Sequence, residues 1–293
     1  MRLFCLKKIK QPSLCCEWQL VIESIGGLIV LDKISIITAS FRSEGTIVDT
    51  LKTINSQTYG NIEHIIVDGG SDDGTLEIVN DIGQRITKIV SEKDNGIYDA
   101  YNKGLELADG EVVGFLNSDD YYYSDEIIQK VMDVFQDEAI EAVYGDLVYV
   151  ARDDTSKVVR HWRSKEYRPG MFKDSFVPAH PTLFLRKSVY QRLGNFNLDY
   201  KLAADYEFML RVFHSAGVKS SYLPTIMVNM RTGGATGESL SSVKAQNKEI
   251  LGALKQHGVD ISSLNFMARK AYDRVGQKLR AAYSLEKQPG FRK

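Results

Sequence analysis

Two adjacent carboxylates, Asp119 and Asp120, come shortly after an apolar run, Val112 to Leu116. Neighbouring carboxylates at the end of a buried strand repel each other, and burying them is costly unless a cation neutralises them. A hard divalent ion, Mn²⁺ or Mg²⁺, takes such oxygen ligands and can also hold a diphosphate. The pair therefore indicates a cation site, with a solvent-exposed turn as the alternative because Asp is common in turns.

Two earlier loops place carboxylates beside glycines. Asp68 is followed by two glycines, which let a backbone approach a ligand while the carboxylate offers acceptors to a base or ribose. A turn before a capped helix explains the same residues. Asp94 precedes Asn95-Gly96, and Asn-Gly is itself a strong turn signal, so both interpretations remain open for this loop as well.

Two later residues are candidates for work on an acceptor. Asp205 opens a segment with helical spacing, where it fits either a helix N-cap or a general base that deprotonates a hydroxyl. His180 precedes an apolar run and could contact an acceptor or a diphosphate, but a packed or turn histidine fits equally well. The five histidines of the chain show no metal-ligand spacing.

An alternation of β-branched runs and amphipathic segments would position these side chains. The pattern predicts strands at 34–38, 64–67, 86–90 and 112–116, and helices at 47–54, 75–82, 97–108 and 124–135, the last with Ser124 as N-cap. Such alternation is typical of an α/β fold with a mostly parallel sheet covered on both faces. In these sheets the loops at the carboxyl ends of the strands form the ligand crevice.

The pattern is looser after residue 140. Strands are predicted at 142–150, 182–185 and 222–230, and an amphipathic helix at 205–216 that Gly217 ends. The stretch from Ser239 is predicted to be helical and increasingly basic.

Composition excludes several classes of protein. The 293 residues carry 37 Lys+Arg and 38 Asp+Glu, a net charge of -1, which argues against a protein that coats nucleic acid by bulk electrostatics. The three cysteines lie near the N-terminus without a partner cluster, so neither a disulfide framework nor a zinc site is indicated, which fits the cytoplasm. The absence of GxGxxG and GxxxxGK[ST] patterns removes the main support for a dinucleotide oxidoreductase or a P-loop hydrolase.

The two ends of the chain differ from its body. Residues 1–32 are expected to be an irregular leader, because Glu17 and Glu23 interrupt its apolar character and the run Ile25 to Leu31 is far shorter than the roughly 20 residues of a membrane helix. Residues 238–293 are expected to form a basic helical extension. Between them, 33–237 is expected to be one catalytic domain, with a half that binds the donor at 33–120 and an acceptor half at 121–237.

The segment from Leu264 to Leu285 has the spacing of a basic amphipathic helix. Its apolar positions recur once per turn, and the basic residues occupy the rest: Leu264, Ala268, Ala271, Tyr272, Val275, Leu279, Ala282 and Tyr283 against Arg269, Lys270, Arg274, Lys278 and Arg280. Either the helix packs its apolar side on the enzyme, or it contacts anionic lipid at the inner face of the membrane.

Five ordered motifs resemble the family 2 glycosyltransferases with the GT-A fold, and the last of them resembles the subgroup that builds bacterial surface polysaccharides. They occur at 34–42, 66–75, 94–104, 114–120, and in the block from 180–184 to 202–207. The resemblance covers roughly residues 33 to 237. It implies a UDP- or GDP-linked sugar donor, a divalent cation, and a saccharide or lipid-linked acceptor.

The resemblance also implies roles for individual residues. Asp119 would ligate the cation, and Asp205 would be the base that deprotonates the acceptor; a single displacement with this base inverts the anomeric centre. The nucleotide-sugar donor would contact a larger set of residues: Thr38, Ala39, Ser40, Arg42, Asp68, Asp94, Asn102, Lys103 and Asp120. Within it, Asp68 and the Thr38 to Ser40 segment would line the nucleoside.

The sequence departs from the family pattern at two positions. Asn117 stands where the family more often has Asp, and Tyr101 stands where many members carry Arg. Neutralisation of the donor phosphates would therefore fall to Lys103 or Arg231.

Two rival functions remain. A metal-dependent nucleotidyltransferase would need a basic loop after the first strand, where only Arg42 is present. A non-catalytic nucleotide-sugar-binding scaffold is disfavoured by the presence of both Asp119 and Asp205.

Overall fold

The structure is a computed structural model that describes residues 23–24, 27–28, 32–233 and 240–284. The chain divides into two units, Met1–Leu31 and Asp32–Lys293. In the first, β1 (Glu23–Ser24) pairs antiparallel with β2 (Gly27–Leu28), and the rest of the expected leader lies outside the described residues. No helix in the described part of the chain is long and apolar enough to cross a membrane.

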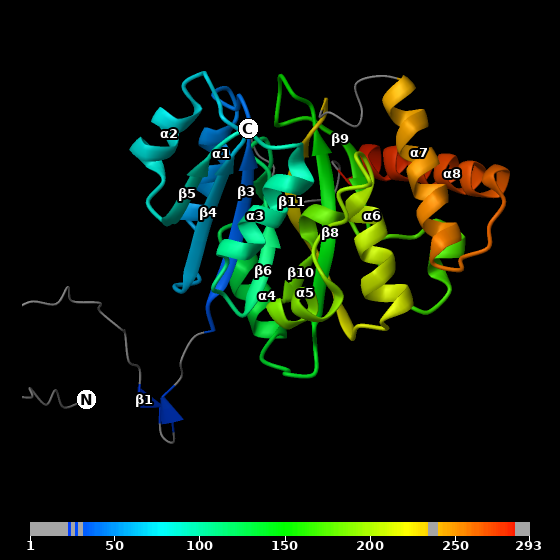
Figure 1. Cartoon of the computed structure of the whole chain (residues 1–293), viewed down its shortest axis with the longest axis horizontal. Helices are drawn as coiled ribbons and strands as arrows, with labels where there is room; N and C mark the ends of the chain where they lie inside the picture. Colours follow the sequence, from blue (N-terminus) through cyan, green and yellow to red (C-terminus); the bar gives the residue numbers. More distant parts are fainter. Residues whose placement is uncertain (1–22, 25–26, 29–31, 234–239, 285–293) are drawn as a thin grey trace, which may run out of the picture. The chain divides into compact units, whose positions relative to one another are not determined.

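The second unit contains the predicted parallel sheet. Four strands, β3 (Ile34–Ser40), β4 (Ile62–Asp68), β5 (Ile86–Ser91) and β6 (Val112–Phe115), run parallel in the order β5-β4-β3-β6 (Figure 1). Every residue of β3, β4 and β6 is buried because helices cover both faces. The mixed α/β sheet with flanking helices confirms the predicted fold class.

The sheet continues with mixed strand directions. β10 (Phe184–Arg186) lies antiparallel between β6 and β8 (Ala142–Val150), and β8 pairs parallel with β11 (Ser220–Arg231). Two antiparallel edge strands complete the sheet, β7 (Tyr121–Tyr122) on β11 and β9 (Val158–Trp162) on β8. The predicted strand at 182–185 is shifted toward residue 186 because His180–Thr182 form a 3₁₀ turn, η2.

Six helices connect or flank these strands: α1 (Ile47–Asn55), α2 (Thr75–Ile82), α3 (Ile97–Leu107), α4 (Ile127–Val134), α5 (Lys187–Leu193) and α6 (Ala204–Met209). The prediction that Ser124 caps α4 is wrong. The carbonyl of Ser124 accepts the side-chain amide of Gln57 at 2.9 Å, while Gln57 Oε1 accepts the amide N–H of Ile128 at 3.0 Å. A long-range cap therefore starts α4 three residues later than the local pattern predicts.

The predicted helix 205–216 is two segments. α6 continues into a π-helical stretch, Leu210–Ser215, and Gly217 follows with a φ of 61°, as expected of a helix-ending glycine. The N-cap of α6 is Ala203, and Asp205 lies in the first turn. The alternative interpretation of Asp205 as a simple N-cap is therefore wrong.

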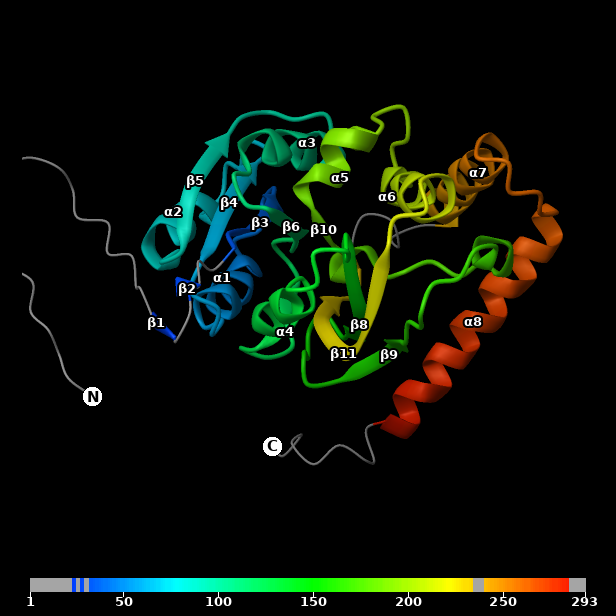
Figure 2. The ribbon, with the colours of Figure 1, turned by 90° about the horizontal axis from the view of Figure 1, so that it is seen from below.

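The C-terminal stretch forms two helices, α7 (Leu240–Gln256) and α8 (Ser263–Ser284), and α8 packs against β9 (Figure 2). Its buried residues are Phe266, Gln277 and Ala281. The opposite face exposes large apolar side chains, including Leu264 (80%), Tyr272 (80%) and Leu279 (67%). The helix packs on the enzyme, but not through the apolar side identified in the sequence.

Candidate active site

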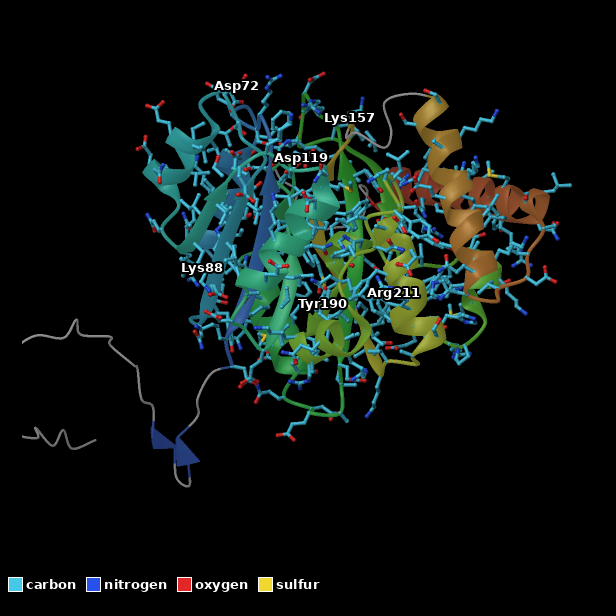
Figure 3. All side chains as sticks on the ribbon, in the orientation of Figure 1. Asp72, Lys88, Asp119, Lys157, Tyr190 and Arg211 are labelled. Atoms are coloured by element: carbon cyan, nitrogen blue, oxygen red, sulfur yellow. The ribbon has the colours of Figure 1, made fainter. Side chains whose placement is uncertain are left out.

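The carboxyl ends of the parallel strands bring the predicted residues to one edge of the sheet. Figure 3 shows Asp72, from the loop after β4, and Asp119, from the loop after β6, at this edge, while Lys88 and Tyr190 lie toward the other end of the strands. Residues 47 positions apart in sequence therefore lie at one edge of the sheet, as expected of parallel strands.

The turn at Asn117–Asp120 is fixed from three sides. Thr50 on α1 donates a hydrogen bond to the carbonyl of Asp120 at 2.6 Å. The hydroxyls of Ser43 and Ser118 are 2.7 Å apart, and Tyr101 donates its hydroxyl to Asn117 Oδ1 at 2.5 Å. The two residues that depart from the family pattern, Tyr101 and Asn117, thus bind each other and support the carboxylate pair.

The two carboxylates differ in burial. Asp120 is fully buried; its Oδ1 accepts the backbone N–H of Arg231 at 3.2 Å, and its Oδ2 has no hydrogen-bond partner among the described residues. Burial, and then the charge of Asp119, raise the pKa of Asp120 well above its usual range. Burial also raises the pKa of the half-buried Asp119.

These features fit a divalent cation bound together with a diphosphate. An unpaired buried carboxylate oxygen next to a second carboxylate is costly, and a cation offsets that cost. Among residues 32–233 and 240–284, no three His, Cys, Asp or Glu side chains form a group that could hold a metal alone. A cation bound here would therefore take part of its coordination from substrate oxygens, as Mg²⁺ commonly does.

Of the two candidates for phosphate neutralisation, the geometry favours Arg231. Its Nη1 donates to the carbonyl of Asp119 at 2.7 Å, and its Nη2 pairs with Asp49. Lys103 Nζ instead forms an ion pair with Glu92 Oε1 at 2.8 Å, within the loop between β5 and α3.

Several predicted donor residues use their side chains within the protein. Asp68 accepts five hydrogen bonds, from Ser40, Ser91, the amides of Gly70 and Ser71, and the Ser71 hydroxyl, and these bonds lower its pKa against the opposing effect of burial. Thr38 Oγ1 lies 3.0 Å from Nε2 of the buried His64, and Ala39 belongs to the core. Asp68, Thr38 and Ala39 therefore support the loops after β3 and β4 from inside the protein.

The residue that projects from this loop is Phe41, which the sequence analysis missed. Its side chain is 56% exposed directly after β3, and it lies beside Gly69, where an added Cβ would be 3.4 Å from the ring and 2.7 Å from Asp94 Oδ2. The guanidinium carbon of Arg42 lies 5.2 Å from the centroid of the Phe41 ring, and the group forms a bidentate ion pair with Asp72. The signal that could have identified Phe41 is its position as the first residue after the strand β3.

Asp205 is held by a tyrosine from α3. Tyr98 donates its hydroxyl to Asp205 Oδ1 at 2.9 Å, and burial together with this carboxylate raises the pKa of Tyr98 well above its usual range. His180 stacks on the ring of Tyr101 with centroids 5.7 Å apart, and burial lowers its pKa, so it is neutral.

Asn102 supports the same region. Its side chain exchanges two hydrogen bonds with the backbone of Phe196, at 2.9 and 3.0 Å, and so holds the loop after α5.

Electrostatic interactions connect the two carboxylate sites. Burial, and then the charges of Asp120 and Asp205, raise the pKa of the fully buried Tyr101 well above its usual range. Tyr101 binds Asn117 in the turn of the predicted cation ligand, Tyr98 binds the predicted base, and the ring centroids of the two tyrosines are 6.1 Å apart.

Known proteins resemble most of this chain. The family model described as "Glycosyl transferase family 2" matches residues 35–194. Over 219 residues the chain is 29% identical to the PGL/p-HBAD biosynthesis glycosyltransferase of Mycobacterium bovis, which covers 70% of this chain and 79% of that protein. Over 104 residues it is 38% identical to WfaP of Escherichia coli, a UDP-Glc:alpha-D-GlcNAc-diphosphoundecaprenol beta-1,3-glucosyltransferase, which covers 34% of this chain and 41% of that protein.

A solved structure shares the fold. The mannosyltransferase PcManGT of Pyrobaculum calidifontis, in complex with GDP-Man and Mn²⁺, matches with a TM-score of 0.59 at 16% identity over 88% of this chain and 75% of that one. The predicted GT-A fold is thereby confirmed.

Proposed function

The chain belongs to glycosyl transferase family 2, and we propose that it transfers a sugar, with inversion, from a UDP- or GDP-linked donor to a lipid-linked saccharide. The observation that carries this proposal is the contact between two tyrosines, Tyr101, which binds Asn117 in the turn of the carboxylate pair, and Tyr98, which binds Asp205; their ring centroids are 6.1 Å apart. Glycosyl transfer needs the leaving diphosphate and the attacking hydroxyl at one carbon atom, and two carboxylate sites joined by neighbouring tyrosines can serve these two groups.

The chemistry follows from the contacts of each group. Among the described side chains, Tyr98 is the one that hydrogen-bonds Asp205, and it uses only Oδ1. Oδ2 is then free to accept the proton of the acceptor hydroxyl while its oxygen attacks the anomeric carbon. As the bond from that carbon to the diphosphate breaks, Arg231 beside Asp119 stabilises the charge that develops. Asp119, next to the buried Asp120, would hold a divalent cation, and this cation would further neutralise the charge on the leaving diphosphate.

The donor base fits the loops after β3, β4 and β5. We place it against the exposed ring of Phe41, with Gly69 allowing close approach and Asp94 at the side. Arg42 and Asp68 then act by holding these loops, and Lys103 acts by fixing the β5–α3 loop through Glu92. Asn102 acts by holding the loop after α5.

Relatives support the acceptor class and the cofactor. WfaP is named for transfer to a diphosphoundecaprenol-linked sugar, and the PcManGT complex contains Mn²⁺. We propose by analogy a lipid-linked acceptor, a role in polysaccharide or glycolipid biosynthesis, and work at the inner face of the membrane. The exposed apolar face of α8, bordered by Lys278 and Arg280, would rest on anionic lipid.

The substitution Asp205→Asn tests the catalytic assignment. Removing the base should lower kcat by about 100-fold to 10,000-fold while donor affinity is retained. Asp199→Asn, an exposed Asp near the same helix, is the matched control and should keep full turnover. Near-normal turnover of Asp205→Asn would contradict the assignment.

The reaction products test the reaction class. Release of a nucleoside diphosphate and an inverted glycosidic bond is expected when sugar donors are supplied. Release of pyrophosphate from a nucleoside triphosphate would favour the nucleotidyltransferase, and binding without turnover would favour the scaffold.

A further inference from the structure

Three positively charged side chains lie where the C-terminal helix α8 contacts the sheet. Arg160 lies on β9, and Lys270 and Arg274 lie one turn apart on α8, which packs along β9 (Figure 2). None of the three forms an ion pair with a carboxylate in the part of the chain that the structure describes. We refer to Arg160, Lys270 and Arg274 as the cation cluster.

Arg160 is held in place without a counter-charge. Its guanidinium carbon lies 3.6 Å from the ring centroid of Tyr149 and 5.4 Å from that of Trp162. Its Nε is buried and has no hydrogen-bond partner among the described residues. Burial lowers the pKa of Arg160, and the charge of Arg274 contributes, so the site holds a positive charge at a cost in free energy.

Lys270 is directed inward from α8. Its Nζ donates to Asn247 Oδ1 on α7 at 2.6 Å and lies 5.6 Å from the ring centroid of Phe266. Burial lowers its pKa to about 8, and the charges of Arg274 and Arg160 act in the same direction, while Asp205 opposes them. Lys270 and Arg274 lie one turn apart on α8, and Arg160 lies on the strand against which α8 packs, so their positive charges repel one another and a bound anion would relieve that repulsion.

The cluster lies next to the helices that adjoin the base. Lys270 binds Asn247 on α7, and α7 packs against α6, the helix that carries Asp205. The charge of Asp205 acts on Lys270 in the direction opposite to burial. The cation pair near Asp119 is a different one, Arg231 and Arg152. An anion bound by the cluster would consequently belong to the acceptor rather than to the donor.

We propose that Arg160, Lys270 and Arg274 bind the diphosphate that joins the acceptor saccharide to its lipid. The inference rests on the proposed function and narrows it, because it names the group that the acceptor must carry. Two guanidinium groups and an ammonium match the oxygens of a diphosphate. α8 also carries exposed apolar residues on its other face, so one helix would contact the lipid surface and the diphosphate of the acceptor.

Isothermal titration of the full chain with geranyl diphosphate tests this site directly. UDP or GDP with excess Mn²⁺ is kept saturating, so that the donor side is filled. Arg274→Gln, an exposed position that should not disturb folding, and Lys270→Gln should each weaken binding of geranyl diphosphate about ten-fold or more, the loss of one charge-assisted contact. Lys255→Gln, an exposed cation on the neighbouring helix α7, is the matched control and should bind as the unaltered chain does.

Three results of these titrations would overturn the inference. Equal binding of geranyl diphosphate by all four proteins would overturn the inference. If Lys270→Gln weakened UDP or GDP binding by the same factor, the cluster would serve the donor and the inference would be overturned. If inorganic pyrophosphate bound as tightly as geranyl diphosphate, the site would take free diphosphate, and the inference would again be overturned. Since the titration measures binding, a protein that binds geranyl diphosphate through the cluster but transfers no sugar would contradict the proposed function and leave the inference intact.

Discussion

At the scale of single residues, the structure separates side chains that face a substrate from those that build the site. Asp68 ends the buried strand β4 and Asp119 follows the buried strand β6, and in the sequence they look alike. Asp68 is saturated by five donors, which come from the last residues of β3 and β5 and from the loop after β4, whereas Asp120 keeps one carboxylate oxygen without a hydrogen-bond partner among the described residues. The number of donors around a carboxylate depends on which loops meet, so sequence could locate Asp68 but could not predict its saturation.

The raised pKa values of Asp119 and Asp120 predict a cation affinity that depends on pH. Because the pKa of both carboxyls is raised in the folded state, the folded protein loses stability as the pH rises and these groups must ionise in a buried site. A divalent cation must displace these protons, so the gain in Tm from Mn²⁺ should grow between about pH 5 and about pH 7.5.

Differential scanning fluorimetry with and without Mn²⁺ measures this effect. Asp119→Asn should remove most of the gain, while Asp153→Asn, an exposed Asp, should not. A gain that is independent of pH, and equal in both variants, would show that the ion binds elsewhere.

At the scale of elements, local patterns located the parallel strands and their helices but not the starts and stops that distant residues set. The start of α4 depends on Gln57, which comes from the loop after α1. The strand β10 was predicted two residues too early, at 182–185, from its apolar residues Phe184 and Leu185, and its direction and its position between β6 and β8 were not predicted. Direction depends on the path of the connecting chain, which hydrophobic spacing does not encode.

Two glycines at these elements should respond differently to alanine. At Gly69 the added Cβ meets the end of the Asp94 side chain at 2.7 Å, so Gly69→Ala should displace Asp94 and weaken donor binding with little change in Tm. At Gly114 the Cβ meets the buried ring of Phe184 on the neighbouring strand, so Gly114→Ala should lower stability by about 1–3 kcal/mol. Urea unfolding and nucleotide titration of both variants separate the effects, and a stability loss at Gly69 as large as at Gly114 would contradict this account of the donor loop.

At the scale of the whole molecule, the near-zero net charge hides an uneven distribution. From Ser263 to Lys293 there are eight Lys or Arg and two Asp or Glu, so the rest of the chain is acidic. In α8, basic residues serve both sides of the helix: Lys270 is directed inward, and Lys278 is exposed beside the apolar face.

The proposed membrane contact predicts that the full chain co-sediments with anionic liposomes and less with neutral ones. The triple substitution of Leu264, Tyr272 and Leu279 to Ser should abolish pelleting, because it removes the exposed apolar face without touching the buried one. Leu198→Ser, an exposed leucine outside α8, is the control. Pelleting that is unchanged in the triple variant would exclude α8 as the contact, and added salt should weaken true binding.

The sequence by itself determined the family, the strand–helix alternation, and the loops that carry the carboxylates, because apolar periodicity and motif order are local properties of the chain. Only the tertiary structure decided which carboxylates keep free oxygens, that Phe41 rather than Thr38 is exposed at the donor loop, and which face of α8 is buried. Amphipathic spacing could not predict a polar inner face of α8, where the half-buried Lys270 binds Asn247 on α7 and the helix packs against the strand of Arg160. Burial of a charge depends on neighbours that are brought together by the fold, and these lie far away in sequence.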